Sequence, residues 1–138
     1  MALSTSVEEA TGRVPITIVA LDGELDASNF EHLIDEVRGL YDRGTRSLLL
    51  DLGGLTFIAS SGLVALHSIV RILHGEQPDD LEAGWDVLHH LGDDAADDTQ
   101  RDVQLAAPQA SVSRVLQRTG MDRLFVIHES RDAGIAAF

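Results

Sequence analysis

The segment that most constrains the fold of this chain is 47–63, which reads SLLLDLGGLTFIASSGL. Its continuous apolar start is typical of a strand buried on both faces. The Gly-Gly pair favours a turn of the backbone, and Ser60 and Ser61 precede a new helical periodicity that begins at Leu63. The segment therefore predicts a strand, a tight loop and a helix whose N-terminus carries two hydroxyls. Free N–H groups and the positive end of the helix dipole favour a phosphate at such a place.

The composition is that of a single globular domain spanning residues 1–138. The chain has 138 residues, of which 44% are hydrophobic, and this is enough for a substantial core. It has no cysteine, which excludes disulfides, cysteine metal sites and a thiol nucleophile. The N-terminus lacks the basic and apolar regions of a secretory signal, and no apolar run is long enough to span a membrane. We therefore expect a cytoplasmic protein without membrane insertion.

The charge balance argues against nucleic acid and anionic membranes as partners. The formal net charge is −13, whereas phosphate contacts need clustered basic residues. All ten basic residues are arginine, so a P-loop lysine and a Schiff-base lysine are excluded. The acidity is concentrated in residues 75–102, where ten acids stand against one base, Arg101.

The order of predicted elements indicates an α/β fold. Residues 1 to about 12 are small and polar and are expected to fray. Four apolar runs predict strands, and helical spacing of apolar residues follows each of them. This alternation predicts helices packed on a mixed, mostly parallel sheet of about four to five strands. The expected strands are 14–21, 46–51, 103–106 and 124–128, and the expected helices are the segments after Ser28, from about Ser61 to His74, from Pro108 to Thr119 and after Ser130.

An acidic insertion, 76–99, follows the second predicted helix. Its two ends are acidic and typical of loops, but four apolar residues between them fall at near-helical spacing: Leu81, Trp85, Leu88 and Leu91. Two interpretations stay open, a short amphipathic helix and a disordered acidic loop. The insertion could dock an arginine-rich partner or be a solvated loop.

A serine hydrolase is one enzymatic alternative. The nucleophile elbow is Gly-x-Ser-x-Gly on a strand-to-helix turn, and residues 58–62 have that topology with Ile58 in place of the first glycine. Asp122 and His128 would have to complete a triad. The chain is short for such a fold, and we expect no enzymatic activity and no catalytic residues.

A metal site in the insertion is a second alternative. His74, His89, His90 and Asp93 carry suitable ligand atoms. Their spacing matches no established metal-binding pattern. We therefore predict no metal and no cofactor.

Three blocks of residues carry a resemblance to a known family. They are 21–26 (LDGELD), 50–63 with its LDL and FIASSGL, and 107–125, which opens with AP and ends with LQRTGMDRLF. With these blocks in this order the chain resembles STAS domains, most closely stand-alone anti-sigma factor antagonists. The resemblance implies a STAS-like fold and a binding module instead of an enzyme.

The resemblance also implies partners and site residues. An anti-sigma factor that is also a serine protein kinase would phosphorylate Ser61, with Ser60 as the alternative, and a phosphatase would reset the cycle. Unphosphorylated antagonist would bind the anti-sigma factor and release a sigma factor, acting as a monomer or weak dimer. A scaffold or partner subunit in a stress-signalling or transport assembly, without phosphorylation, is the alternative. The expected partner-binding residues are Asp26, Thr56, Ser60, Ser61, Gly62 and Leu63.

Two departures from the family pattern bear on these roles. The family usually has Asp directly before the two serines, where this chain has Ala59, and it usually has a short turn in place of 76–99. Either change is compatible with a different partner. The serines also have a purely structural interpretation, because serine is a common helix N-cap.

Overall fold

The computed structural model describes residues 2–76 and 100–138 of the chain. They form one five-stranded sheet in the order β1-β2-β3-β4-β5, in which β1 is antiparallel to β2 and the other pairs are parallel. The predicted α/β fold with a mixed, mostly parallel sheet is confirmed. The strands are β1 (Leu3–Thr11), β2 (Pro15–Leu25), β3 (Leu48–Ile58), β4 (Gln100–Ala106) and β5 (Phe125–His128). The helices are α1 (Phe30–Asp42), α2 (Ser60–Leu73), α4 (Ala110–Thr119), the 3-10 turn η2 (Met121–Arg123) and α5 (Arg131–Ala137).

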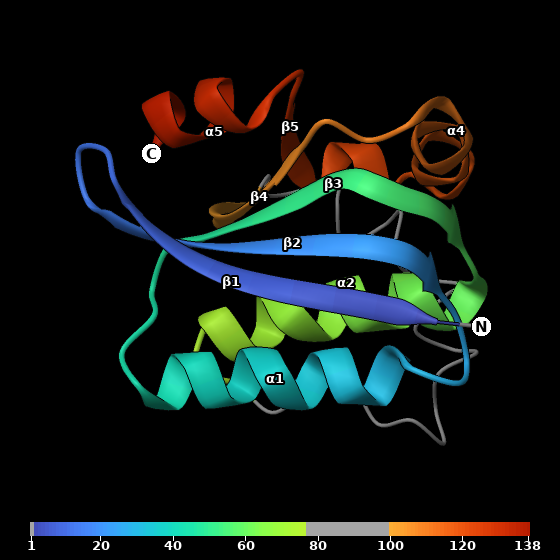
Figure 1. Ribbon diagram of the computed structural model, residues 1–138, viewed down its shortest axis with the longest axis horizontal. Coiled ribbons are helices and arrows are strands. Elements are labelled where there is room, and N and C mark those ends of the chain that lie inside the picture. The colour runs from blue at the N-terminus through green and yellow to red at the C-terminus, as the bar shows by residue number, and fades with distance from the viewer. Residues whose placement is uncertain (1, 77–99) are drawn as a thin grey trace.

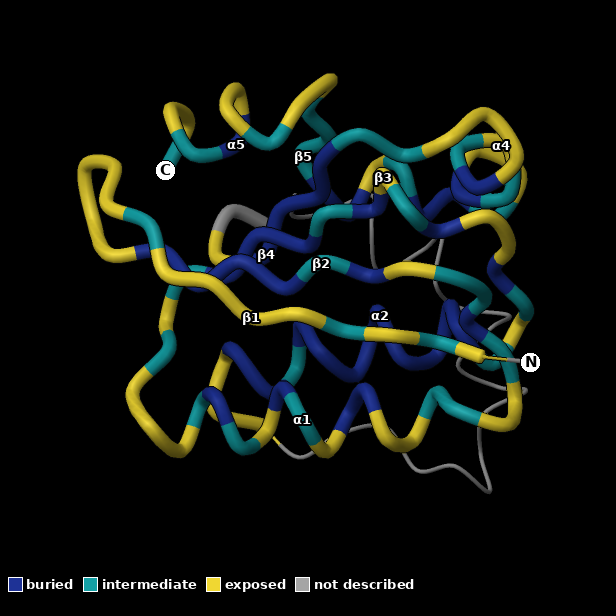
Figure 2. Tube along the Cα trace, viewed as in Figure 1, coloured by how far each residue is buried: buried dark blue, intermediate teal, exposed yellow. Residues whose placement is uncertain are grey.

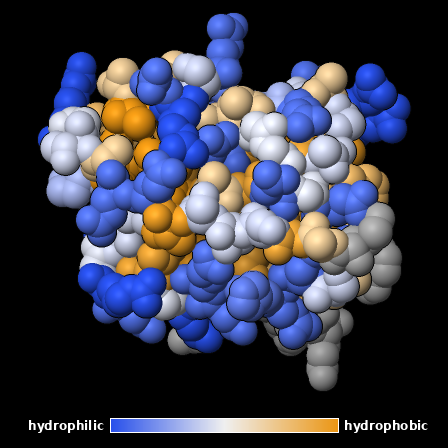
Figure 3. Space-filling model, in the orientation of Figure 1, coloured by the Kyte–Doolittle hydropathy of each residue, from blue (hydrophilic) through white to orange (hydrophobic). Residues whose placement is uncertain are grey.

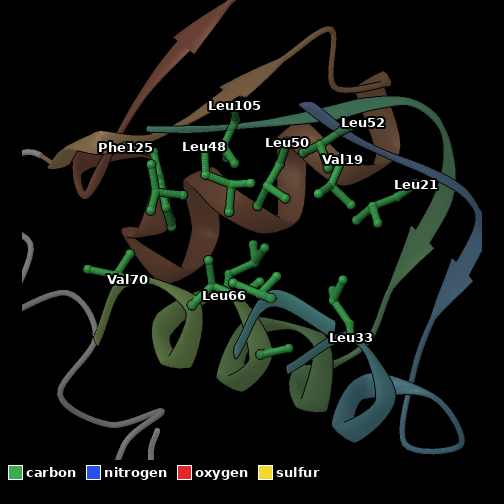
Figure 4. Close-up of a cluster of buried hydrophobic side chains, with 14 of the residues drawn as sticks. Val19, Leu21, Leu33, Leu48, Leu50, Leu52, Leu66, Val70, Leu105 and Phe125 are labelled. Atoms are coloured by element: carbon green, nitrogen blue, oxygen red, sulfur yellow. The ribbon is translucent and has the colours of Figure 1, made fainter. Parts of the chain in front are cut away.

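The apolar run that opens β3 is buried on both faces of the sheet, as the sequence predicts. Leu48, Leu49 and Leu50 all have 0% exposure. Figure 1 shows α1 and α2 along one face of the sheet and α5 across the other. Side chains from the strands and from α1 and α2 point toward one another in the larger core (Figure 4), among them Val19, Leu21, Leu48, Leu50, Leu105, Leu33, Leu66 and Val70.

The second face of the sheet is covered by the short C-terminal helix α5. Ile135 and Phe138 pack against a small cluster that contains Ile16, Ile18 and Leu49. A Cβ atom on Gly134 would lie 2.8 Å from Leu49 Cδ1, so the absent side chain lets α5 lie directly on β3. The helix α5 covers only part of this face, and the carboxyl ends of β2 and β3 extend beyond it (Figure 1).

The expectation that residues 1 to about 12 fray is wrong. Leu3–Thr11 form β1, which pairs along its whole length with β2, from Leu3 opposite Gly23 to Thr11 opposite Pro15. The strand lies at the sheet edge and is mostly exposed (Figure 2), which explains its polar composition. An antiparallel edge strand needs only one apolar face or none. The alternation of apolar residues that would predict a strand is therefore weak in β1.

The tight loop expected at the Gly-Gly pair is also absent. The strand β3 runs through Gly53 and Gly54 to Ile58, and its register against β2 shifts twice, between Ala20 and Asp22 and between Gly23 and Glu24. Each shift inserts one extra residue in β3, which is a β-bulge. The glycines therefore bend a continuous strand instead of ending it.

Helix ends agree only in part with the sequence signals. Ser130 caps α5, because its Oγ accepts a hydrogen bond from the Ala133 amide at 3.1 Å, and Gly120 ends α4 in the left-handed conformation. The N-cap of α1 is Asn29, whose side chain makes no capping hydrogen bond. Predictions on 77–99, including Trp85, lie outside the described residues.

The surface carries few large apolar side chains. On the face seen in Figure 3, hydrophilic residues are in the majority and hydrophobic ones lie among them. Among the described residues, the large hydrophobic side chains that are exposed are Val7, Val14 and Phe57. No helix in the ranges 2–76 and 100–138 is both long and apolar enough to cross a membrane.

Candidate functional site

The carboxyl ends of β2 and β3 lie side by side at one end of the sheet, which is called the shared edge below. Leu25 is paired with Ile58, and the Ala59 amide donates to the Leu25 carbonyl at 2.9 Å. Asp26, which follows β2, and Ser60, two residues beyond the end of β3, are therefore brought to the same edge. In parallel α/β sheets this edge is where binding sites are commonly found.

The helix α2 begins directly at the serine pair. Ala59 is the N-cap in an extended conformation, and its side chain makes no cap hydrogen bond. The amides of Gly62 and Leu63 donate to the Ala59 carbonyl, whereas no backbone acceptor is present in the described structure for those of Ser60 and Ser61. Ser60 is exposed and Ser61 is half-buried. Neither hydroxyl makes a hydrogen bond to any described residue, so the purely structural role of a capping serine is not seen here.

Gly62 lets the first turn of α2 approach both strands. A Cβ atom on this residue would lie 2.6 Å from Ile58 Cγ1 and 2.9 Å from Leu25 Cγ. Leu63, the next residue, is 3% exposed and belongs to the core. Of the predicted partner-binding residues, Gly62 and Leu63 therefore lie beneath the surface that Ser60 and Ser61 form.

Asp26 organises the loop between β2 and α1. Its carboxylate accepts hydrogen bonds from the Ser28 amide at 2.9 Å and from the Ser28 hydroxyl. The Asp26 amide donates to Asn29 Oδ1 at 3.0 Å, and Asn29 Nδ2 donates to the Glu24 carbonyl at 2.9 Å. The hydrogen bond from the Ser28 hydroxyl, followed by that from its amide, holds the pKa of Asp26 below its usual range. The loop therefore presents a carboxylate that stays charged at neutral pH.

Thr56 lies on the second bulge of β3 and joins three elements. Its hydroxyl donates to the Gly23 carbonyl at 3.0 Å, and its own carbonyl accepts from the Ser111 hydroxyl of α4 at 3.0 Å. Asp26, Thr56 and the serine pair are thus held on one edge by β2, β3, α2 and α4.

Sequence reasoning did not single out two further residues of this edge. Phe57 is 49% exposed, although it lies in a strand between Thr56 and the buried Ile58. Its β2 partner, Glu24, has a buried Oε2 atom without a hydrogen-bond partner in the described structure. The apolar sequence around Phe57 does not indicate that this residue is exposed. Its exposure results from the register shift between β2 and β3, which cannot be read from the sequence.

The enzymatic and metal alternatives are not supported by the described residues. His128 Nε2 lies 2.6 Å from Gln104 Oε1 and makes no hydrogen bond to either serine. His74 Nε2 lies 3.8 Å from Asp102 Oδ2, and no group of three or more metal-ligating side chains is present within the described ranges. The other proposed ligands, His89, His90 and Asp93, lie outside those ranges.

A family comparison identifies the class of protein that this fold and edge define. A family model described as STAS domain matches residues 8–76, half of the 138 residues of the chain. The match runs from β1 to the end of α2 and includes Asp26 and both serines. The chain belongs to the STAS domain family.

Individual relatives are anti-sigma factor antagonists. The chain is 26% identical over 121 residues to the "Putative anti-sigma factor antagonist BtrV" of Bordetella bronchiseptica, covering 88% of this chain and 84% of that one. Its fold is similar to the crystal structure of an anti-sigma factor antagonist from Mycobacterium paratuberculosis, with a TM-score of 0.67, 19% identity, and coverage of 99% and 93%. It is also similar to the Bacillus cell fate determinant SpoIIAA in the phosphorylated form, with a TM-score of 0.57, 16% identity, and coverage of 94% and 96%.

The packing of α2 predicts that Gly62→Ala destabilises the protein. The added methyl group meets the buried Ile58 and Leu25 side chains, and overpacking of this kind costs about 1–3 kcal/mol. Gly39→Ala is a matched control in the interior of α1, where the nearest atom to a new Cβ is Arg43 Nη1 at 3.9 Å. It should stabilise by about 0.5–1 kcal/mol through helix propensity. Urea unfolding of both variants checks this, and equal free energies of unfolding for the two would contradict it.

Proposed function

We propose that this chain is an anti-sigma factor antagonist, a binding module without catalytic activity that binds an anti-sigma factor and so releases a sigma factor. The observation that carries the proposal is the shared edge of Asp26, Thr56, Phe57 and the serine pair, found in a STAS chain with antagonists among its relatives. The activity is binding alone, so the proposal needs neither a metal nor a cofactor. It places the chain in the cytoplasm, where sigma factors act, as a monomer or weak dimer.

The composition of this edge supports contact with another protein. Phe57 supplies an exposed aromatic ring, and polar groups of Thr56 and Asp26 surround its strand end. Protein interfaces commonly combine a central aromatic residue with a polar rim.

The start of α2 supports phosphorylation as the switch. The amides of Ser60 and Ser61 and the helix dipole would hold a phosphate in place. The same phosphate would add about −1.5 to −2 charges to a surface that already carries Asp26 and would disrupt a matched interface. Ser61 is the acceptor that the family pattern favours, whereas the greater exposure of Ser60 makes its hydroxyl the more accessible one. A serine protein kinase, which is the anti-sigma factor itself, and a phosphatase complete the cycle.

Ala59 restricts how a kinase could recognise this chain. It occupies the N-cap position of α2, where the family usually has an acid that could cap the helix. The kinase would therefore recognise the loop through other groups, and Asp26 is an ordered carboxylate on the same shared edge.

A negative charge at the serine pair is expected to weaken binding. Ser60→Asp and Ser61→Asp should each reduce affinity for the serine-kinase anti-sigma factor by at least about tenfold, because an unmatched charge in an interface costs more than about 1.4 kcal/mol. Ser60→Ala and Ser61→Ala should bind like the wild type, and the one that removes the acceptor should abolish phosphorylation. Calorimetry with the purified serine-kinase anti-sigma factors of the same organism, and mass spectrometry after incubation with ATP, measure these effects. Wild-type affinity for both Asp variants would contradict the switch.

Phe57 is expected to be the main apolar contact. Phe57→Ala should lower the affinity for the same anti-sigma factor by about 1–2 kcal/mol, as for an interface aromatic residue. Val14→Ala is the control, because Val14 is 41% exposed but lies in the turn between β1 and β2, at the opposite end of β2. It should bind like the wild type. Equal losses for both variants would place the contact surface elsewhere.

A further inference from the structure

The strand β3 loses one of its two neighbours at Asp51. It pairs with β4 only over residues 48–51, and Asp51 lies opposite Ala106, the last residue of β4. Beyond this point β3 continues beside β2 alone, and its register shifts by one residue immediately after Asp51. The first bulge of β3 therefore lies just beyond the end of the β3–β4 pairing, on the way from the core to the shared edge that carries the serine pair.

Side chains satisfy the backbone groups of this bulge. The Gly53 amide donates to Asp51 Oδ1 at 2.9 Å, and the Gly53 carbonyl accepts from Gln109 Nε2 at 2.8 Å. A bulge removes ladder partners, so these two bonds replace hydrogen bonds that a regular strand would have. The path of β3 beyond Gly53 thus depends on the orientation of the Asp51 side chain.

Arg131 fixes that orientation from the opposite end of the sequence. It is the first residue of α5, and its Nε donates to Asp51 Oδ2 at 3.0 Å. Its Nη1 donates to Glu8 Oε2 on β1 at 2.7 Å. The Asp51 carboxylate therefore bridges α5 and the Gly53 amide, one oxygen to each. Its side chain is 17% exposed, so solvent screens the contact with Arg131 only in part.

We propose that Arg131 is a positioning residue for the shared edge, which carries Phe57 and the serine pair. It acts through Asp51 on the first bulge of β3. Four residues beyond Gly53 lies Phe57, and Ser60 follows at the start of α2, so the bulge sets where both are presented. The geometry couples the docking of α5 to the order of the segment that precedes α2. The importance of this coupling for binding rests on the proposed function, whereas the coupling itself does not.

Amide hydrogen exchange on the purified full chain tests the coupling. Arg131→Gln should raise exchange in residues 52–56 about fivefold, since a charge-assisted hydrogen bond that supports the segment is lost, and should leave α1 unchanged. Arg131→Lys retains one charged donor and should recover most of the protection. Glu8→Ala is the matched control: it removes the outer contact of Arg131, keeps the Asp51 bond and should leave residues 52–56 unchanged.

Two results would overturn the proposal. An equal rise in α1 and in residues 52–56 would show that Arg131 supports only the global stability of the fold. Unchanged exchange in residues 52–56 would show that the bulge holds its shape without Arg131. Neither result concerns the anti-sigma factor, so the coupling can fail while the proposed function stands, and the binding experiments can fail while the coupling stands.

Discussion

The burial of β3 on both faces is the constraint on which the rest of the structure depends. With Leu48, Leu49 and Leu50 at 0% exposure, the strand needs apolar cover from α1 and α2 on one side and from α5 on the other. Hydrophobic burial of this kind is the dominant favourable contribution to folding. It fixes β3 in the middle of the sheet, and every residue of the candidate site is placed relative to the end of this strand.

Beyond Asp51 the same strand changes character, and this change produces the site. β3 loses β4 as a neighbour, bulges twice and reaches the serine pair beside the end of β2. The bulges leave backbone groups that side chains satisfy, including those of Thr56 and of Gln109, the N-cap residue of α4. The first part of the strand is thus buried on both faces, whereas the second part contributes Leu52, Leu55 and Ile58 to the core and leaves Thr56 and Phe57 exposed.

Sequence patterns predicted what depends on local composition and missed what depends on register. The apolar runs of β2 and β3 and the start of α2 were predictable, because burial on both faces leaves a continuous apolar signal. The edge strand β1 was not, since a polar strand paired along one side looks like a loop. The exposure of Phe57 follows from one-residue shifts between β2 and β3, and no residue type in the segment predicts these shifts.

The central claim is that the shared edge of β2, β3 and α2 binds an anti-sigma factor and that phosphorylation prevents it. The most direct measurement is an NMR titration of the ¹⁵N-labelled chain with the purified serine-kinase anti-sigma factor, before and after phosphorylation of the serine pair. The account predicts amide shift changes concentrated in residues 24–26 and 56–63 for the unmodified chain, and their loss for the phosphorylated one. Changes centred on α5 or on the turn between β1 and β2, or changes that persist after phosphorylation, would contradict it.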